Sequence, residues 1–246
     1  MSTILITGCS TGFGLNIAKH FLAQGWSVIA TMRNVRDNKL PAEPNLRVLA
    51  LDVTDAESIR NAVEAAGPID VLVNNAGIGF LNAVEATPID TARAIFETNT
   101  LGTIAMTQAV LPQFRQRKAG VVINVTSSVT LKPLPLLSVY TASKAAVNAF
   151  TESVSLELRP FNIRVALVLP GRSPETSFGE NARALMLAGF PEAYAGFAQG
   201  IVAGWQADTS ELTRSQDVAD AVWYAATDPT APMRIPAGAD AVALTA

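Results

Sequence analysis

The chain has 246 residues, of which 49% are hydrophobic and only 16% are charged. A disordered chain needs the opposite balance, so this composition predicts a folded protein with its own core. No run approaches the ~18 apolar residues that span a bilayer, and the first residues lack the basic segment of a signal peptide. The net charge of −3 gives no footprint for nucleic acid, and the single cysteine, Cys9, excludes a disulfide framework or a multi-cysteine metal site. We therefore expect a soluble, cytoplasmic protein without a metal.

Short apolar runs alternate with longer helical patterns along the chain. The runs are continuous, as expected of strands whose two faces are both covered by helices. The expected strands are Ile4–Ile6, Trp26–Thr31, Leu46–Leu51, Ile69–Val73, Val121–Val125 and Ile163–Leu169. The expected helices are Leu15–Gln24, Asp55–Ala66 with Thr54 as its N-cap, Thr98–Lys118 and Ser138–Leu158. These repeated units predict an α/β fold: one domain with a doubly wound parallel sheet and helices on both faces.

The segment from Arg172 to Ser210 departs from this alternation. It mixes prolines and glycines with aromatic and apolar residues. It follows the carboxyl end of the sixth strand, where open α/β sheets bind their ligands. The segment is either an apolar packing flap or the wall of a substrate pocket, and the pattern leaves both interpretations open.

A glycine-rich turn, Thr7–Gly14, joins the first strand to the first helix. Gly8 allows the tight turn, Gly12 lets backbone amides approach a pyrophosphate, and Gly14 permits close packing of the helix on the strand. The N-terminus of the helix then faces the anion. A glycine-rich connection is also found in ordinary turns, so the rest of the sequence must decide.

Two further groups follow expected strands. Asp52 stands where a carboxylate can reach an adenine amino group, although a turn residue is an equally good interpretation. The run Asn74–Gly77 ends the fourth strand. Its small and amide residues suit a backbone that bends and lines a cofactor, and a plain turn is the alternative.

Tyr140 and Lys144 are four residues apart in an expected helix and therefore share one face. An ammonium beside a phenol favours the phenolate and lowers its pKa from about 10 toward neutral pH. Such a tyrosine exchanges a proton with a hydroxyl or carbonyl oxygen. Ser127, at the end of the fifth strand, is in a position to hydrogen-bond the same oxygen. An isolated pair of this kind is more often an ordinary surface pair, so the other motifs of the chain must decide between the two interpretations.

The glycine turn, Asn74–Gly77, Ser127, the Tyr140–Lys144 pair and Pro170–Gly171 occur in one order. Together they resemble the short-chain dehydrogenase/reductase family over nearly the whole chain. The resemblance implies a Rossmann-type domain and an oxidoreductase that passes a hydride between a nicotinamide and a carbonyl carbon. The stretch Val28–Arg33 is similar to the branch with 17β-hydroxysteroid-dehydrogenase-like and retinol-dehydrogenase-like reductases, which suggests a lipophilic carbonyl or alcohol.

The resemblance also implies roles for single residues. Tyr140 would be the general acid/base, and Lys144 would lower its pKa and bind the nicotinamide ribose. Ser127 would position the substrate carbonyl, and Asn99 would support a proton relay. Ser128 competes with Ser127, but the distance of 13 residues to Tyr140 favours Ser127. The cofactor contacts implied are Gly8, Ser10, Thr11, Gly12, Phe13, Gly14, Arg33, Asp52, Val53, Asn75, Ala76, Gly77, Tyr140, Lys144, Pro170 and Gly171.

The residues after the second strand bear on the choice of cofactor. NAD-selective sites place a carboxylate there, whereas an arginine accommodates a 2′-phosphate. The run Ala30–Asn34 holds no acid and includes Arg33, so we expect NADP(H) rather than NAD(H).

Two departures from the family pattern lie near the end of the chain. Thr176 comes about one residue later than the family's threonine after Pro170–Gly171, which leaves its role open. The run Arg234–Asp240 lacks the usual apolar strand and Asp-Gly-Gly ending, so the seventh strand is expected to be short or irregular.

Two rival functions remain at this point. A sensor or scaffold would bind NADP(H) with little turnover, but the presence of both Tyr140 and Lys144 favours the enzyme. The second rival is epimerase or dehydratase chemistry; such relatives usually carry a longer C-terminal substrate region, and the short tail here argues against it, so a reductase/dehydrogenase is expected. The two long helices Thr98–Lys118 and Ser138–Leu158 suggest packing across a two-fold axis, in a homodimer or homotetramer.

Overall fold

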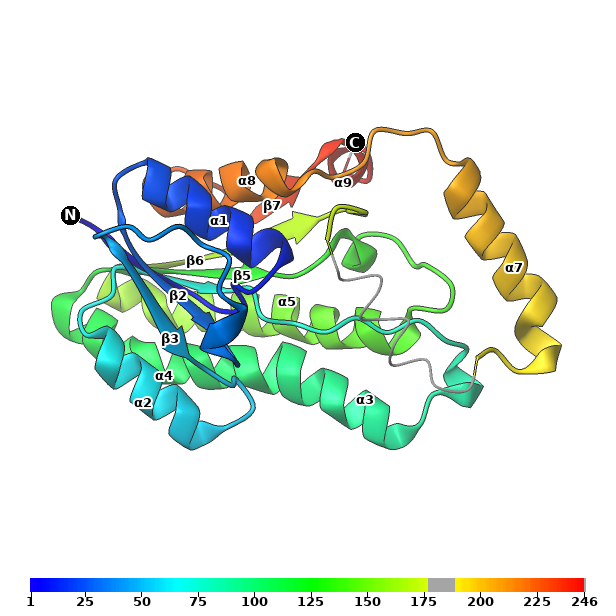
Figure 1. Ribbon diagram of the computed structural model, residues 1–246, viewed down its shortest axis with the longest axis horizontal. Helices are drawn as coiled ribbons and strands as arrows, with labels where there is room; N and C mark the ends of the chain where they lie inside the picture. The colour runs from blue at the N-terminus through cyan, green and yellow to red at the C-terminus, as the bar shows by residue number, and fades with distance from the viewer. Residues whose placement is uncertain (177–188, 246) are drawn as a thin grey trace.

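The computed structural model describes residues 1–176 and 189–245 (Figure 1). Seven parallel strands form one sheet in the order β3-β2-β1-β4-β5-β6-β7. The strands are β1 Thr3–Ile6, β2 Ser27–Met32, β3 Leu46–Ala50, β4 Val71–Asn74, β5 Gly120–Val125, β6 Ile163–Pro170 and β7 Arg234–Ala237. The predicted doubly wound parallel sheet is therefore confirmed. Residues 177–188 of the expected flap lie outside the described residues.

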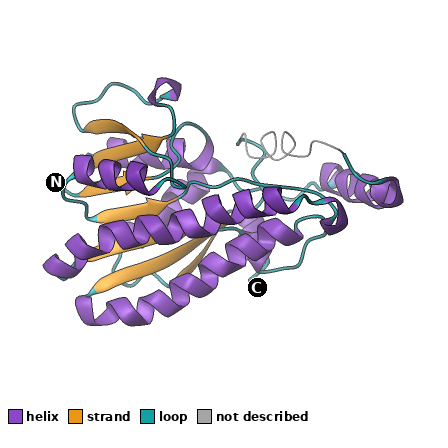
Figure 2. Ribbon diagram, turned by 90° about the horizontal axis from the view of Figure 1, so that it is seen from below, coloured by secondary structure: helices purple, strands orange, loops and turns teal. Residues whose placement is uncertain are grey.

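Helices cover both faces of this sheet (Figures 1 and 2). The α-helices described are α1 Gly12–Ala23, α2 Ala56–Ala66, α3 Ile89–Phe96, α4 Gly102–Arg117, α5 Ser138–Leu158, α7 Glu192–Ala207, α8 Ser215–Thr227 and α9 Ala239–Ala243. Short turns of other helix types are η1 Val35–Asp37, η2 Val84–Ala86, η3 Glu97–Leu101, η4 Ser128–Thr130 and η5 Arg159–Phe161. Helices α1 and α8 pack on one face, and α2, α4 and α5 pack on the other.

The continuous apolar strands divide their side chains between two cores. In β1, Ile4 and Ile6 face the core under α1 and α8, whereas Leu5 faces the core under α2, α4 and α5. Successive strand side chains point to opposite faces, so a strand covered on both sides is mostly apolar along its whole length. In the first core, the Phe21 ring lies 5.1 Å from both the Trp26 and the Trp223 rings and joins α1 to α8.

Three expected helix starts differ from the structure, the first being α1, which begins at Gly12 rather than Leu15. Helix α2 is capped by Asp55, whose carboxylate accepts from the backbone N–H groups of Glu57 and Ser58, so the assignment of Thr54 as N-cap was wrong. Thr54 instead belongs to the preceding turn, because its hydroxyl donates to Asp52.

The helix expected from Thr98 is the second part of a longer unit. Helix α3 starts at Ile89, passes through the π-helical turn η3 and continues as α4 to Arg117. The π turn places Asn99 inside a bulge, a local feature that apolar periodicity does not reveal.

The C-terminal third contains elements that the pattern did not predict. Helix α7 occupies much of the expected flap and stands at one end of the molecule, away from the sheet (Figures 1 and 2). Its three interior glycines, Gly196, Gly200 and Gly204, each lower the helix propensity, which explains why it was missed. The seventh strand forms: β7 is short but pairs in parallel with β6.

The sheet order brings the candidate motifs to one edge. Strand β1 lies between β2 and β4. The strand order runs outward from β1 to β2 and β3 on one side and from β4 onward on the other side, so it reverses at this point. Open α/β sheets bind ligands at the carboxyl ends of strands beside such a switch point. The glycine turn after β1, the run Asn74–Gly77 at β4, Ser127 after β5 and Pro170–Gly171 at β6 all lie at carboxyl ends.

Candidate active site

The glycine turn has the backbone that its sequence predicts. Gly8 and Gly12 have φ angles of 75° and 60°, in the left-handed region that favours glycine. A Cβ on Gly14 would lie 2.3 Å from the carbonyl oxygen of Gly8, so only glycine permits this approach of α1. Within the described residues, Thr11, which precedes α1, makes no side-chain capping bond to the helix. The first amides of α1 are therefore left for an anion.

Cys9 is an inert packing residue within this turn. Its side chain is fully buried, and the thiol donates to the carbonyl oxygen of Ile6. Burial raises the pKa of Cys9 to about 12, so the reactive thiolate is disfavoured.

The end of β4 is tied to the glycine turn. The hydroxyl oxygen of Thr7 accepts from the backbone N–H groups of Asn75 and Ala76, both at 2.9 Å. The amide of Asn75 donates to the carbonyl oxygens of Thr7 (2.9 Å) and Gly8 (3.2 Å). Asn75 therefore fixes the shape of the turn. Thr7 has the same function, although the sequence alone did not single it out.

The expected catalytic group is assembled and buried. Tyr140 is 5% exposed and Asn99 is 1% exposed. A hydrogen bond joins the side chains of Ser127 and Tyr140. Because Tyr140 is bonded to Ser127, this arrangement favours Ser127 over Ser128 as the serine that would bind the same substrate oxygen as Tyr140. Ser127 lies two residues after β5 ends and Tyr140 lies in the first turn of α5, at the carboxyl edge of the sheet.

Lys144 and Asn99 lie next to this pair. The ammonium of Lys144 donates to the carbonyl oxygen of Val125 at 3.0 Å. A Cβ on Gly77 would lie 3.1 Å from Asn99 Oδ1 and 3.3 Å from Lys144 Nζ, so Gly77 leaves room for both. The run that ends β4 therefore contacts the same group of residues as α5.

Asn99 holds backbone on two sides. Its amide accepts from the N–H of Ile78 and donates to the carbonyl oxygen of the same residue. It also donates to the hydroxyl of Ser143 at 3.0 Å, and Ser143 donates to the carbonyl oxygen of Tyr140 at 2.7 Å. Asn99 thus connects the segment after β4 to the turn of α5 that carries Tyr140. Ser143 completes this connection and was not predicted.

The protonation of the group differs from the expectation. Burial raises the pKa of Tyr140 above its ordinary value, against a smaller lowering by the Ser127 hydrogen bond. Burial also lowers the pKa of Lys144 from 10.5 to about 8. The expected lowering of the Tyr140 pKa by Lys144 was wrong for this arrangement, because desolvation disfavours both charged forms.

Asp52 and Val53 have local roles after β3. The Asp52 carboxylate accepts from the N–H and the hydroxyl of Thr54, at 2.9 and 2.7 Å. These bonds, and more weakly the charge of Arg33, lower the pKa of Asp52. These bonds are those expected of a turn residue, and the contact of Asp52 with the cofactor stays a prediction. Val53 packs closely against Gly102, since a Cβ on that glycine would lie 2.8 Å from the Val53 side chain.

A basic depression adjoins the glycine turn. It has a volume of about 390 Å³ and is lined by Ser10, Thr11, Arg36, Asp37, Asn38 and Lys39. Arg33 is exposed just beyond β2, on the same connection. Asn34 caps the turn η1 by accepting from the N–H of Arg36, which fixes the backbone there. Arg36 and Lys39 were missed, although with Arg33 they form a basic series at intervals of three.

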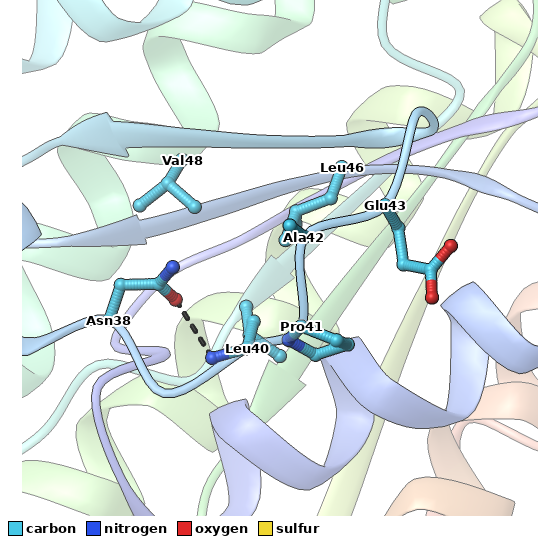
Figure 3. A pocket seen from close by; sticks show the side chains of 7 residues that line it. All are labelled: Asn38, Leu40, Pro41, Ala42, Glu43, Leu46 and Val48. Atoms are coloured by element: carbon cyan, nitrogen blue, oxygen red, sulfur yellow. Dashed lines mark hydrogen bonds between the residues drawn. The ribbon is translucent and has the colours of Figure 1, made fainter.

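A larger depression lies nearby and is lined mostly by apolar side chains (Figure 3). Its volume is about 490 Å³, and its lining is Asn38, Leu40, Pro41, Ala42, Glu43, Leu46 and Val48. The amide oxygen of Asn38 already accepts from the N–H of Leu40 at 2.9 Å. None of the candidate catalytic residues lines it, so it is not the active site.

The segment after β6 closes one side of the site. A Cβ on Gly171 would lie 2.1 Å from Asp240 Oδ1, and the next backbone N–H, that of Arg172, donates to Asp240 Oδ2. Thr176 reaches the glycine turn, since a Cβ on Gly12 would lie 3.4 Å from its side chain. Its hydroxyl donates to the carbonyl oxygen of Ser173. Phe13, by contrast, packs its ring against the core under α1.

Comparison with known proteins agrees with this arrangement. A family model described as short chain dehydrogenase matches residues 2–184. The chain belongs to the short-chain dehydrogenase family, and it is accordingly an oxidoreductase of the alcohol–carbonyl type that uses a nicotinamide cofactor.

Three relatives illustrate the range of the family. An uncharacterized oxidoreductase of Bacillus subtilis, YusZ, is 38% identical over 91% of this chain and 84% of its own length. A 3-ketodihydrosphingosine reductase of Bacteroides thetaiotaomicron is 39% identical over 78% of this chain and 71% of its own length. The human 17-beta-hydroxysteroid dehydrogenase type 1 is 36% identical over 68% of this chain, which spans 55% of that relative. The expected resemblance to the hydroxysteroid-dehydrogenase branch is confirmed.

Solved structures show the same fold. A short-chain dehydrogenase from Streptomyces avermitilis superposes with a TM-score of 0.85 at 32% identity, covering 99% of this chain and 90% of that one. The closed form of a serine dehydrogenase complexed with NADP+ superposes with a TM-score of 0.81 at 29% identity, covering 96% and 94%. Across residues 1–176 and 189–245, no helix has the length and hydropathy to cross a membrane.

Proposed function

We propose that the protein is an NADP(H)-dependent oxidoreductase that interconverts a lipophilic ketone or aldehyde with its alcohol, with Tyr140 as general acid/base. The observation that carries this proposal is the hydrogen bond between Ser127 and Tyr140 at the carboxyl edge of the sheet. Two hydroxyl groups that meet at a buried point beside the glycine turn are suited to hold one carbonyl oxygen.

Ser127, Tyr140 and Lys144 have separate roles in the proposed reduction of the carbonyl. Ser127 and Tyr140 donate to the substrate oxygen and orient the carbonyl. A bound nicotinamide supplies the hydride that the carbonyl carbon receives. Tyr140 gives its proton to the oxygen, and the alcohol results. Tyr140 is protonated at neutral pH, as a group that donates to the substrate oxygen must be. Lys144, with a pKa of about 8, is positively charged at neutral pH and compensates the phenolate that remains.

The cofactor site fits a dinucleotide with a 2′-phosphate. The uncapped start of α1 and the left-handed glycines leave backbone N–H groups for a pyrophosphate. Arg36 and Lys39 supply positive charge beside Ser10, against one carboxylate, Asp37, and a ribose 2′-phosphate would lie there. Arg33 adds a further exposed cation on the same connection. No acid ends β2, so the usual partner of a free 2′-hydroxyl is missing from that strand. Asn99, Gly77 and Lys144 would meet the nicotinamide end.

The substrate wall is apolar. Ala83, Leu136 and Ala198 form a small buried cluster between the loops of the site and α7, with Leu81, Phe190, Tyr194 and Ile201 packed against it. Leu136 belongs to the loop that leads into α5, the helix that carries Tyr140. A surface of this kind favours a lipophilic substrate. The names of the sphingosine-type and steroid-type relatives point the same way.

The experiment that tests the function is a pair of titrations. Purified protein is titrated with NADPH and with NADH while nicotinamide fluorescence is recorded, and a panel of long-chain and cyclic ketones is then assayed at 340 nm. We expect tighter binding of NADPH and turnover of lipophilic ketones. Binding of NADPH without turnover of any carbonyl would favour a cofactor-binding sensor or scaffold instead.

We also propose that the chain acts as a homodimer or homotetramer through α4 and α5. Exposed apolar side chains support the proposal: Leu156 on α5 is 69% exposed, and Leu101, which ends η3 directly before α4, is 48% exposed. A flat pair of long helices on one face of the sheet can pack against its own copy across a two-fold axis.

A further inference from the structure

Arg172 contacts two parts of the chain that the fold otherwise leaves apart. Its guanidinium donates from Nη1 to the carbonyl oxygen of Trp205 at 3.0 Å and from Nη2 to Asp208 Oδ2 at 2.9 Å. Trp205 lies in the last turn of α7, and Asp208 follows the helix. Arg172 itself stands directly after Pro170–Gly171. One side chain thus joins the end of β6 to the end of α7.

The end of α7 needs such a partner. The last four carbonyl groups of a helix have no partner within the helix, and Arg172 takes up one of them. A carboxylate is also unfavourable at a helix C-terminus, whereas a cation is favourable there. Asp208 sits at this end, and its pKa is lowered by the bonds from Ser210 and further by the charge of Arg172. The guanidinium therefore stabilises both the helix end and the carboxylate.

On its other side, Arg172 belongs to a segment held against the cofactor site. Its backbone N–H donates to Asp240 at 2.7 Å, and the Gly171 N–H donates to Thr213 at 2.9 Å. Glu175 accepts from the N–H of Ser215 at the start of α8. Thr176 then rests on Gly12 of the glycine turn. A pyrophosphate bound on that turn would meet this segment.

Helix α7 has few other attachments among the described residues. Ala198 is its one fully buried side chain there. Toward its N-terminal end, Tyr194 donates to Glu85 at 2.9 Å and packs with Ile201 on the apolar cluster beside Leu136. The helix is therefore held by packing against the apolar cluster on one side and by the hydrogen bonds of Arg172 at its last turn.

We infer that Arg172 is a positioning residue that joins the cofactor-facing segment 171–176 to α7, so that cofactor binding steadies the substrate wall. This inference rests on the proposed function. If cofactor binding steadies the substrate wall and so strengthens substrate binding, substrate binding strengthens cofactor binding by the same factor, because coupling is reciprocal. The contact is specific to a guanidinium, since a lysine cannot donate to Trp205 and Asp208 from two fixed nitrogens.

Hydrogen–deuterium exchange of the α7 amides tests the contact. We compare wild type with Arg172→Ala, Arg172→Lys and Asp208→Asn, each with and without NADPH. Arg93→Ala is the matched control, because it removes a similar but exposed pair with Asp90 on α3. We expect exchange in residues 201–207 to be at least about fivefold faster in Arg172→Ala and intermediate in Arg172→Lys. NADPH should slow α7 exchange in wild type and in the control, and much less in Arg172→Ala.

Kinetics supply the second readout. We expect Arg172→Ala to raise KM for the ketone about fivefold or more, with kcat within about twofold and the Kd of NADPH within about threefold. Equal α7 exchange in Arg172→Ala and wild type, or an equal effect of NADPH on both, overturns the inference. If Arg172→Ala does not fold, Asp208→Asn carries the same comparison. If NADPH does not bind at all, the proposed function fails, whereas the exchange without nucleotide still tests the contact.

Discussion

At the scale of single residues, burial decides the chemistry of the site. Tyr140 and Lys144 are both buried, and each is pushed toward its neutral form. The spacing of the two residues predicted that they share a helix face, which the structure confirms. The spacing could not reveal the direction of the pKa shifts, because desolvation depends on what the fold packs around them.

The buried lysine should reduce stability. Since the pKa of Lys144 falls from 10.5 to about 8, the folded state binds its proton less tightly than the unfolded state. The cost is fully present below pH 8 and disappears as the pH rises toward 10.5. We expect Lys144→Met to be about 1–3 kcal/mol more stable than wild type at pH 7, after the loss of the bond to Val125, and to lose turnover.

Urea unfolding of both proteins at pH 7 and at pH 10 measures this difference. The advantage of Lys144→Met should shrink at pH 10, because wild-type Lys144 is then largely neutral in the folded state. A wild-type protein that is more stable than the variant at pH 7 would contradict the assigned shift.

The basic series after β2 should select the cofactor. We expect Arg33→Ala and Arg36→Ala each to weaken NADPH binding by about tenfold, because each removes a charge-assisted contact to phosphate. NADH binding should change less than about twofold, since it lacks that phosphate. Lys118→Ala, a cation at the far end of α4, is the control. Fluorescence titration measures both constants, and equal losses for NADPH and NADH would argue against a 2′-phosphate site here.

At the scale of elements, apolar periodicity worked where packing is dense. Helix α5 has the predicted bounds Ser138–Leu158, because it packs along the sheet for its whole length. Helix α7 was missed because its glycines weaken the helical pattern, and the contacts that hold it come from residues distant in sequence. The Arg172–Asp208 pair spans 36 residues, and no local pattern contains it. The site followed the same rule: the glycine turn and the Tyr140–Lys144 spacing are local, whereas the link from Asn99 through Ser143 needs the fold.

Two glycines in helices should respond in opposite ways to alanine. Gly14→Ala places a Cβ 2.3 Å from the Gly8 carbonyl oxygen, so α1 must shift, at a cost of about 1–3 kcal/mol and much of the cofactor affinity. A Cβ on Gly204 in α7 meets no described atom within 4 Å. Gly204→Ala should therefore stabilise that helix by about 0.5–1 kcal/mol. Thermal unfolding and NADPH titration of both variants check this contrast. A normal cofactor affinity in Gly14→Ala would contradict the structure of the turn.

At the scale of the whole molecule, the sheet order explains why distant motifs form one site. With β1 beside both β2 and β4, the glycine turn, Gly77, Ser127 and Gly171 gather at one edge. The opposite edge is left to packing. Leu156 is exposed on α5, in the helical layer that covers one face of the sheet, and is available for assembly.

Assembly through these helices predicts a specific disruption. We expect size-exclusion chromatography with light scattering to show a dimer or tetramer. Leu156→Arg should reduce it toward the monomer, because a charge would replace an apolar contact on α5. Val242→Arg on α9, which alters a similarly exposed apolar residue, should leave the assembly unchanged. A monomeric wild type, or equal disruption by both variants, would rule out this interface.

In the proposed reaction, Tyr140 transfers the proton to a carbonyl held with Ser127. The most direct measurement is the rate of NADPH oxidation with the best ketone of the panel, compared among wild type, Tyr140→Phe and the exposed-tyrosine control Tyr224→Phe. We predict that Tyr140→Phe lowers kcat/KM by about 10²–10⁴-fold, with the Kd of NADPH within about threefold and the control unchanged. Turnover of Tyr140→Phe at the wild-type rate would contradict the account.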